Sequence, residues 1–248
     1  MIISYISLKG GVGKTTLSWL STPVLASDGT VAVVDLEARN DLAMNMGVVA
    51  EIDCLGNRLY YSDPLEDLKP VACDIANVWV YASHGKALTA LERELLSSPT
   101  QQTTARAGLA AVSERYDYVV VDTPGGASSL GFLALDVADV IVVPTGFDWL
   151  VGKGGKETVL MIKERRPDVP IVVVPNAVSG NRRYSDELVN GIAALGKLPN
   201  VSVAPSIPYR ASATRERDGL PVTGVTRSDA ISIQVRALMS QATGKDFA

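Results

Sequence analysis

The chain has 248 residues and a net charge of -4, and its 47% apolar and 20% charged residues are the balance of an ordinary globular protein. No apolar run approaches the ~20 residues that span a bilayer and no basic signal-peptide start is visible, so a cytoplasmic location is expected. The two cysteines, Cys54 and Cys73, form no Cys-x-x-Cys motif, so neither a disulfide framework nor a zinc or Fe–S site is supported.

Seven apolar, β-branched runs predict strands along the chain. They cover residues 1–7, 31–36, 78–83, 116–123, 139–145, 169–176 and 201–205. Near-continuous apolar runs of this kind are typical of parallel strands that are buried on both faces.

Segments with helical spacing separate most of these runs. They cover residues 15–29, 87–98, 103–116, 155–168, 185–198 and 227–244. Residues 47–77, rich in Asp, Gly, Pro and Tyr, are predicted to be irregular with one short helix. The alternation predicts an α/β fold, a doubly wound, mostly parallel sheet flanked by helices, as one domain over residues 1–248.

The stretch SLKGGVGKTT (residues 7–16) lies between the first predicted strand and the first predicted helix. Gly13, Lys14 and Thr15 fit the spacing of the phosphate-binding pattern G-x-x-x-x-G-K-[ST]. Glycines let backbone N–H groups turn towards phosphate oxygens, and the following helix presents its positive end. Lys14 is expected to neutralise the β- and γ-phosphates, Thr15 to bind Mg²⁺ and Thr16 to contact the α-phosphate.

Leu8 and Lys9 depart from that general pattern, because Leu8 occupies the first glycine position. The form K-G-G-x-G-K-T-T resembles the deviant Walker A motif of the ParA/MinD family of partition and cell-division ATPases. The resemblance implies ATP and Mg²⁺ as ligands and a homodimer that encloses two ATP molecules. Lys9 would be the signature lysine, which reaches the phosphates held by the partner subunit. The residues expected to line the nucleotide phosphates are Lys9, Gly10, Gly11, Val12, Gly13, Lys14, Thr15 and Thr16.

Two strands are predicted to end in an aspartate. Asp122 closes the strand in YDYVVVDTPGG, and the carboxyl end of a buried strand is the ligand side of an open α/β sheet. It is expected to hold Mg²⁺ through water, as the Walker B aspartate does. Asp35 ends the second strand and is expected to belong to the same metal site, with Thr15.

Glu37 follows Asp35 in VVDLEARND (residues 33–41), where the family usually has D-x-D-P-Q. The second aspartate of that motif orients the attacking water. A glutamate can accept the proton, but its extra methylene moves the carboxylate by over ~1 Å, and misplacement of that order can cost ~10²-fold in rate. The resemblance implies slow ATP hydrolysis with Lys9, Lys14, Glu37 and Asp122 as catalytic residues.

Similarity to the family extends from residue 1 to about 240 and is weakest at 47–100. IPYRASATRERDGLPV (residues 207–222) resembles a family stretch close to the adenine. By this resemblance, the base is expected to contact Asn176, at the end of a strand, and the loop that follows the last strand. The expected contacts in that loop are Pro205, Ile207, Pro208 and Tyr209.

Charge is distributed unevenly along the chain. Residues 1–149 hold 9 Lys+Arg against 18 Asp+Glu, whereas residues 150–248 hold 14 against 9. Charge alone indicates either a patchy, solvated surface or a basic face for a polyanion. ParA-type members bind DNA without sequence preference, and the basic half of the chain favours this branch. The expected DNA contacts are Arg182, Arg183, Arg210, Arg215 and Arg217, with Lys153, Lys156, Arg165, Arg166, Arg227 and Arg236 as further candidates.

The ParA-type resemblance also implies an activating partner protein of ParB type and association with the nucleoid when ATP is bound. A MinD-like ATPase that acts at a membrane is one alternative. However, the end of the chain, from Ile231 onwards, carries only Arg236 and Lys245 as cations, too few for a membrane-anchoring basic face. An ATP-dependent metabolic enzyme of the same fold is the other alternative.

Overall fold

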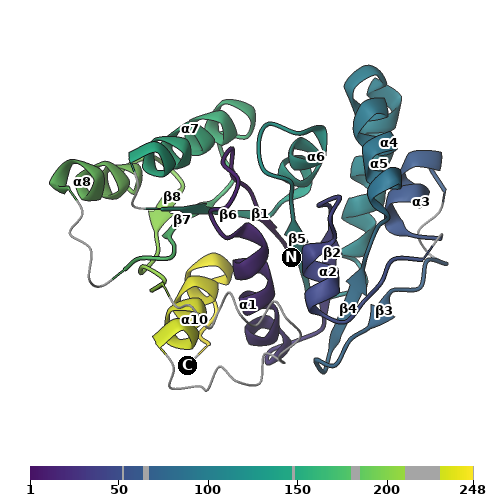
Figure 1. Ribbon diagram of the computed structural model, residues 1–248, viewed down its shortest axis with the longest axis horizontal. Coiled ribbons are helices and arrows are strands. Elements are labelled where there is room, and N and C mark those ends of the chain that lie inside the picture. The colour runs from purple at the N-terminus through teal and green to yellow at the C-terminus, as the bar shows by residue number, and fades with distance from the viewer. Residues whose placement is uncertain (52, 64–66, 147–148, 180–184, 210–229, 248) are drawn as a thin grey trace.

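The computed structural model describes residues 1–51, 53–63, 67–146, 149–179, 185–209 and 230–247, and its centre is an eight-stranded sheet (Figure 1). The strand order is β3-β4-β2-β5-β1-β6-β7-β8. Neighbouring strands pair in parallel, except that β3 runs antiparallel to β4 at one edge. The predicted mostly parallel sheet is therefore confirmed. The strands are β1 Ile2–Tyr5, β2 Val31–Asp35, β3 Val71–Ala72, β4 Val78–Tyr81, β5 Tyr118–Asp122, β6 Val140–Thr145, β7 Ile171–Pro175 and β8 Val201–Val203.

Helices cover both faces of the sheet, as a doubly wound fold requires. In Figure 1, α1, α2 and α10 lie on one face and α3 to α8 lie on the other, in agreement with the three clusters of buried apolar side chains. The helices are α1 Lys14–Ala26, α2 Asp41–Asn45, α3 Leu55–Tyr61, α4 Gly85–Ser97, α5 Pro99–Val112, α6 Ser129–Val137, α7 Trp149–Arg165, α8 Asp186–Leu195 and α10 Ala230–Thr243.

The apolar strand sequences follow from this two-sided burial. Val120 of β5 packs in the cluster under α1, whereas its neighbours Val119 and Val121 pack in a cluster on the opposite face. Successive side chains of a strand point to opposite faces, so a sheet covered on both sides needs apolar residues at every position.

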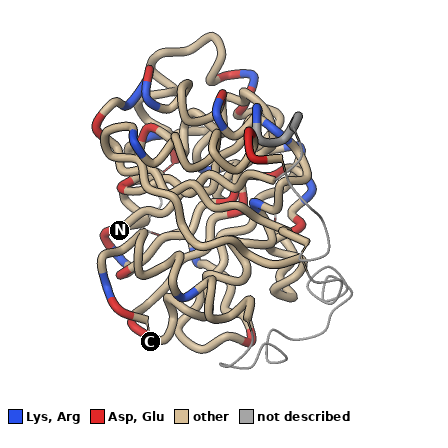
Figure 2. The backbone as a smooth tube through the Cα atoms, turned by 90° about the vertical axis from the view of Figure 1, so that its left-hand side faces the viewer, with Lys and Arg blue, Asp and Glu red and all other residues tan. Residues whose placement is uncertain are grey.

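Two charged side chains interrupt the apolar strands among the described residues. Asp35 and Asp122 are the last residues of β2 and β5. They are register partners on adjacent strands, and both are fully buried. Most other charged residues lie on the helices and loops around the sheet (Figure 2). Among the described strand residues, the buried charged side chains therefore lie at the carboxyl edge of the sheet.

Some elements go beyond the sequence prediction. The predicted short helix within residues 47–77 is α3, but β3 adds an edge strand there. Helix α7 begins at Trp149, six residues before the predicted start. Helix α6 has no amphipathic period because Leu130, Gly131, Leu133, Ala134 and Leu135 are all buried. Its start is fixed by the Ser128 hydroxyl, which accepts the Gly131 amide at 2.9 Å.

Candidate nucleotide site

The loop between β1 and α1 has the geometry of a phosphate-binding loop. Gly11 and Gly13 have φ values of 72° and 93°, in the region that favours glycine. A methyl group on Gly10 or Gly11 would meet no heavy atom within 4 Å, so this part of the loop borders open space. The space lies at the N-terminal end of α1, where unpaired N–H groups and the helix dipole favour an anion.

Lys14, the first residue of α1, is buried beside this loop with only 7% of its surface exposed. Its Nζ lies 3.5 Å from the position that a methyl group on Gly125 would occupy. Burial lowers the pKa of Lys14, while the charges of Asp122 and Glu37 raise it. The ammonium group is therefore held between the phosphate loop and the loop after β5, facing nearby carboxylates.

Asp122 is connected to α1 by two hydroxyl groups. Thr15 Oγ1 donates to its Oδ2 at 2.7 Å, and Ser18 Oγ donates to its Oδ1 at 3.3 Å. Burial, together with the neighbouring charge of Asp35, raises the pKa of Asp122 to about 7, although the Thr15 and Ser18 hydroxyls and the charge of Lys14 lower it. The sequence prediction that Thr15 and Asp122 lie together is matched by this contact.

The donor set of Thr15 and Asp122 fits Mg²⁺, which prefers hard oxygen ligands and keeps several waters. In the part of the chain that the structure describes, no group of three or more His, Cys, Asp or Glu residues could hold a metal. A hydroxyl and a single carboxylate would leave coordination positions for water and phosphate oxygens, which is how Mg²⁺ is usually bound with a nucleotide. The residues present therefore fit a Mg²⁺–nucleotide site.

Asp35 anchors the turn that carries Glu37. Its Oδ1 accepts the Glu37 amide and its Oδ2 accepts the Ala43 amide, each at 3.0 Å. Burial raises the pKa of Asp35 to about 6, although these two backbone bonds lower it. The turn also rests on α4, because a methyl group on Gly85 would lie 2.5 Å from the Ala38 carbonyl oxygen. A role for Asp35 in metal binding stays a prediction.

Asn176, which follows β7, lies against the phosphate loop. Its Nδ2 donates to the Val12 carbonyl at 2.8 Å. Ile207 and Tyr209 are beside it, since their amides donate to the carbonyls of Pro175 and Val178, each at 2.8 Å. The residues expected at the adenine therefore gather at this edge, although the Ile207 side chain belongs to the core. The contact with Val12 has no signature in the sequence, and the adenine contacts stay predictions.

We expect Gly13→Ala to damage the phosphate loop. A methyl group there would lie 2.1 Å from Asn176 Nδ2, on a residue with a φ of 93°. Strain of this kind costs about 1–3 kcal/mol, so the melting temperature should fall by several °C and ATP binding should weaken at least tenfold. Calorimetry and ATP titration of Gly13→Ala measure these effects. Gly191→Ala is the control, because its added methyl group has open space. An unchanged melting temperature would contradict it.

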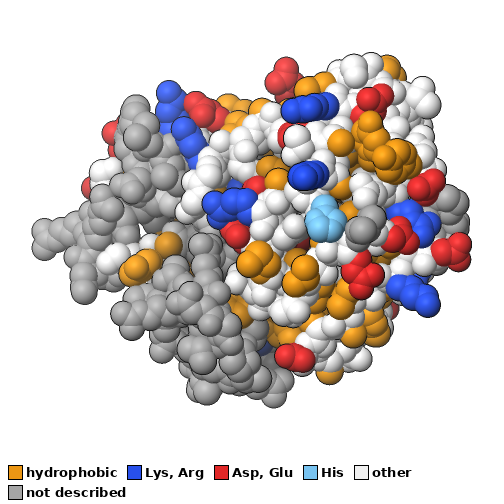
Figure 3. Space-filling view, turned by 45° about the vertical axis from the view of Figure 1, so that its right-hand side comes forward, with side chains coloured by type: hydrophobic (Ala, Val, Ile, Leu, Met, Phe, Trp, Pro, Cys, Tyr) orange, Lys and Arg blue, Asp and Glu red, His pale blue; other side chains and the backbone are white. Residues whose placement is uncertain are grey.

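The described part of the structure contains none of the five expected DNA contacts. Arg182, Arg183, Arg210, Arg215 and Arg217, and the further candidate Arg227, lie outside the described residues. Arg165 is paired with Asp136, with Nε 2.6 Å from Oδ1, and Arg166 donates to three backbone carbonyls. Figure 3 shows Lys and Arg side chains mixed with Asp and Glu on the face that it presents. Among the described residues, Arg165 and Arg166 are therefore weaker candidates than the sequence suggests.

Comparisons with known proteins place this chain in a family. The family model of an AAA domain matches residues 1–168. A protein of Pseudomonas putida is 28% identical over 171 residues, which are 65% of this chain and 62% of the relative. The sporulation initiation inhibitor protein Soj of Bacillus subtilis is 29% identical over 157 residues, 62% of this chain and 61% of Soj. The chain covers less than two thirds of the length of either relative.

Solved structures show the same fold over nearly the whole chain. Apo McdA of Cyanothece matches with a TM-score of 0.83 at 18% identity. The match covers 97% of this chain and 98% of the McdA chain. Cobyrinic acid a,c-diamide synthase from Mycobacterium smegmatis, with bound ADP and magnesium, has a TM-score of 0.77 at 20% identity, with coverages of 99% and 96%. The septum site-determining protein MinD from Pyrococcus horikoshii shares this fold as well, with a TM-score of 0.74 at 19% identity over 98% of this chain and 95% of MinD. The family model and the Soj relative show that the chain belongs to the ParA/MinD family of P-loop ATPases.

Proposed function

We propose that this chain is a ParA-type ATPase whose ATP-bound homodimer binds DNA without sequence preference and positions a DNA or protein cargo. The observation that carries the proposal is the different setting of the two loop lysines. Lys14 is buried beside the carboxylates of its own subunit, whereas Lys9 is partly exposed at the start of the same loop. A second, accessible lysine at this position suits the phosphates of a partner subunit.

The chemistry proposed for the site uses its own residues in distinct roles. Lys14 and the loop amides would bind the phosphates, while Thr15 and Asp122 would hold Mg²⁺, which supplies charge neutralisation at the phosphates. Glu37 would orient the attacking water from the turn that Asp35 anchors. Hydrolysis would be slow until a partner protein of ParB type stimulates it and separates the dimer.

DNA binding is proposed from the charge of the second half of the chain. Residues 150–248 hold 14 Lys+Arg against 9 Asp+Glu. A dimer would bring two such surfaces to one duplex, and doubling the phosphate contacts increases both the affinity and its dependence on salt. Nucleotide state would then control DNA binding through dimer formation.

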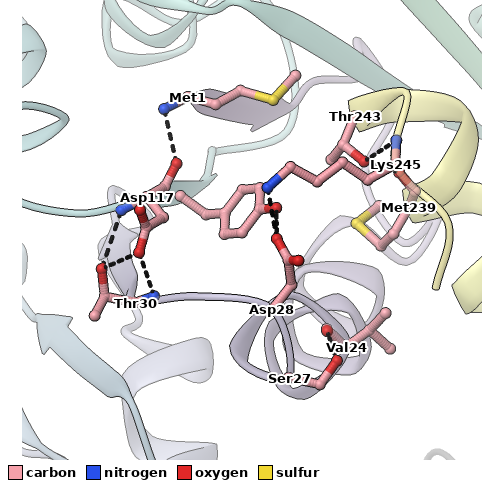
Figure 4. A network of polar contacts seen from close by, with 10 residues as sticks. Met1, Val24, Ser27, Asp28, Thr30, Asp117, Met239, Thr243 and Lys245 are labelled. Atoms are coloured by element: carbon pink, nitrogen blue, oxygen red, sulfur yellow. Dashed lines mark hydrogen bonds and ion pairs between the residues drawn. The ribbon is translucent and has the colours of Figure 1, made fainter.

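The C-terminal helix argues against the membrane alternative. The apolar side of α10 is buried against α1 and the sheet, through Ile231, Val235, Leu238, Met239 and Ala242. After it, Lys245 Nζ donates to Asp28 at 2.6 Å and lies 5.0 Å from the centre of the Tyr118 ring (Figure 4). This segment is held to the body of the protein. No helix among the described residues is long and apolar enough to cross a membrane.

We expect Lys9→Ala to abolish ATP-dependent DNA binding while leaving ATP binding to the monomer within about threefold of wild type. The lysine would act on the partner's phosphates, so its loss should weaken the dimer at least tenfold, or about 1.4 kcal/mol. Binding to random-sequence duplex DNA is measured with ATP, with ADP and without nucleotide, at two salt concentrations. Lys86→Ala, on the exposed side of α4, is the matched control.

Binding of the protein to vesicles of anionic lipid is measured alongside, as is the rate of ATP hydrolysis by the protein alone. Binding of the wild type to vesicles but not DNA would favour a membrane-positioning ATPase. Rapid ATP hydrolysis without DNA, dimer formation or a partner would favour a metabolic enzyme. The cobyrinic acid a,c-diamide synthase is an enzyme with the same fold as this chain. DNA binding that is equal in all nucleotide states would contradict the proposed switch.

A further inference from the structure

Helix α7 holds the beginning of the phosphate loop through one buried threonine. The Leu8 amide donates to Thr158 Oγ1 at 3.0 Å, and the same hydroxyl donates to the Gly154 carbonyl at 2.7 Å. Thr158 is fully buried. One turn of α7 therefore fixes the backbone at the position where Leu8 replaces the usual glycine.

The Lys9 side chain lies along the same turn of α7. A methyl group on Gly154 would stand 2.3 Å from Lys9 Cγ and 3.0 Å from Lys9 Cε. Non-bonded carbon atoms prefer about 3.5–4.0 Å, so the lysine stem occupies the space that any larger residue would need. Glycine inside a helix lowers helix stability relative to alanine, and Gly154 is buried within α7. The close approach of Lys9 gives a reason for a glycine there.

We propose that Gly154 and Thr158 are positioning residues for Lys9, which they hold in a fixed orientation before a dimer forms. The inference rests on the proposed dimer, in which Lys9 acts on the partner's nucleotide. A free lysine side chain loses much rotamer freedom when an interface fixes it. A stem already ordered on α7 loses less, and such preorganisation strengthens association.

The test compares Gly154→Ala with Gly191→Ala in the full chain. Both add a methyl group inside a helix, but at Gly191 that group has open space. Gly154→Ala is expected to weaken ATP-dependent dimerisation at least tenfold in sedimentation experiments, with monomer affinity for ATP unchanged. In the nucleotide-free monomer, Lys9 should be acylated severalfold faster in Gly154→Ala, as followed by mass spectrometry. Gly191→Ala should match wild type in both measurements.

A double-mutant comparison separates positioning from a general effect on folding. If Gly154 acts through Lys9, adding Gly154→Ala to Lys9→Ala should change dimerisation no further. If Gly154→Ala weakened dimerisation equally in the wild type and in Lys9→Ala, the inference would be overturned. Dimerisation of Gly154→Ala as strong as in the wild type or stronger would also overturn it, as would an unchanged rate of Lys9 acylation. A wild-type chain that stays monomeric with Mg²⁺ and ATP would instead overturn the proposed function, and this inference with it.

Discussion

Replacing Lys14 by alanine is expected to weaken Mg²⁺–ATP binding at least about 100-fold. Lys14 is buried next to the phosphate loop, where the charges of Asp122 and Glu37 raise its pKa against the effect of burial. Truncating one partner of a buried charge pair costs about 2–5 kcal/mol, and every 1.4 kcal/mol is tenfold in affinity. Dimerisation and DNA binding should disappear with nucleotide binding, because both follow from it in the proposed switch.

Isothermal titration with ATP and Mg²⁺ measures this effect directly. Lys86→Ala again serves as the control, since it removes an equal charge from an exposed position on α4. Lys14→Ala also removes the charge that lowers the pKa of Asp122, so the melting temperature of both variants is needed. If folded Lys14→Ala bound ATP within a few-fold of wild type, the assignment of the phosphate site would be wrong.

Asp122→Asn is expected to stabilise the nucleotide-free protein, and increasingly so as the pH rises. The folded state holds a proton on Asp122 up to a pKa of about 7, whereas the ordinary value is 3.8. Between these values the folded state binds more protons than the unfolded chain, so wild-type stability falls with rising pH. Above pH 7 the buried carboxylate costs roughly 2–4 kcal/mol, which the neutral amide avoids. The gain should be small near pH 4, close to the ordinary pKa of 3.8, because protonation of the unfolded chain is then well advanced.

Thermal unfolding without nucleotide from pH 4 to pH 8 tests this expectation. For a chain of this size, 2–4 kcal/mol corresponds to roughly 5–15 °C in melting temperature. The pKa of Asp35 is raised to about 6, so Asp35 also makes the stability fall with rising pH, by a smaller amount. This contribution remains in Asp122→Asn. Asp168→Asn, at an exposed loop residue, controls for net charge. A gain that is the same at pH 4 and pH 8 would show that Asp122 is not buried as a titrating acid.

The predicted strands and the phosphate loop are visible in the sequence because their signals are local. A strand buried on both faces shows itself as an unbroken apolar run, such as Val119, Val120 and Val121. A glycine-rich stretch between a strand and a helix indicates the phosphate loop. The position of Asp122 at the end of a strand indicates that it lies on the ligand side of the sheet. Each signal spans only a few neighbouring residues, so the sequence reports it directly.

Helix α6 and the first turns of α7 are not visible in this way. Nearly every side of α6 is buried, so its apolar residues show no helical period. Helix α7 contains Gly152, Gly154 and Gly155, which local propensity disfavours. Gly155 lies against Thr145 of β6, where a methyl group would be 2.4 Å from the hydroxyl oxygen. The close approach of α7 to the sheet overrides its helix propensity.

The sequence by itself determined the α/β class, the phosphate loop and the aspartate that faces it, because each depends on residues close in the chain. Only the tertiary structure decided what surrounds them. Asn176 reaches Val12, 164 residues away, because β7 and β1 end at the same edge of the sheet. Lys9 rests on Gly154 for a similar reason, since α7 packs beside the loop that follows β1. Crossover topology brings such pairs together, and no local pattern of residues records it.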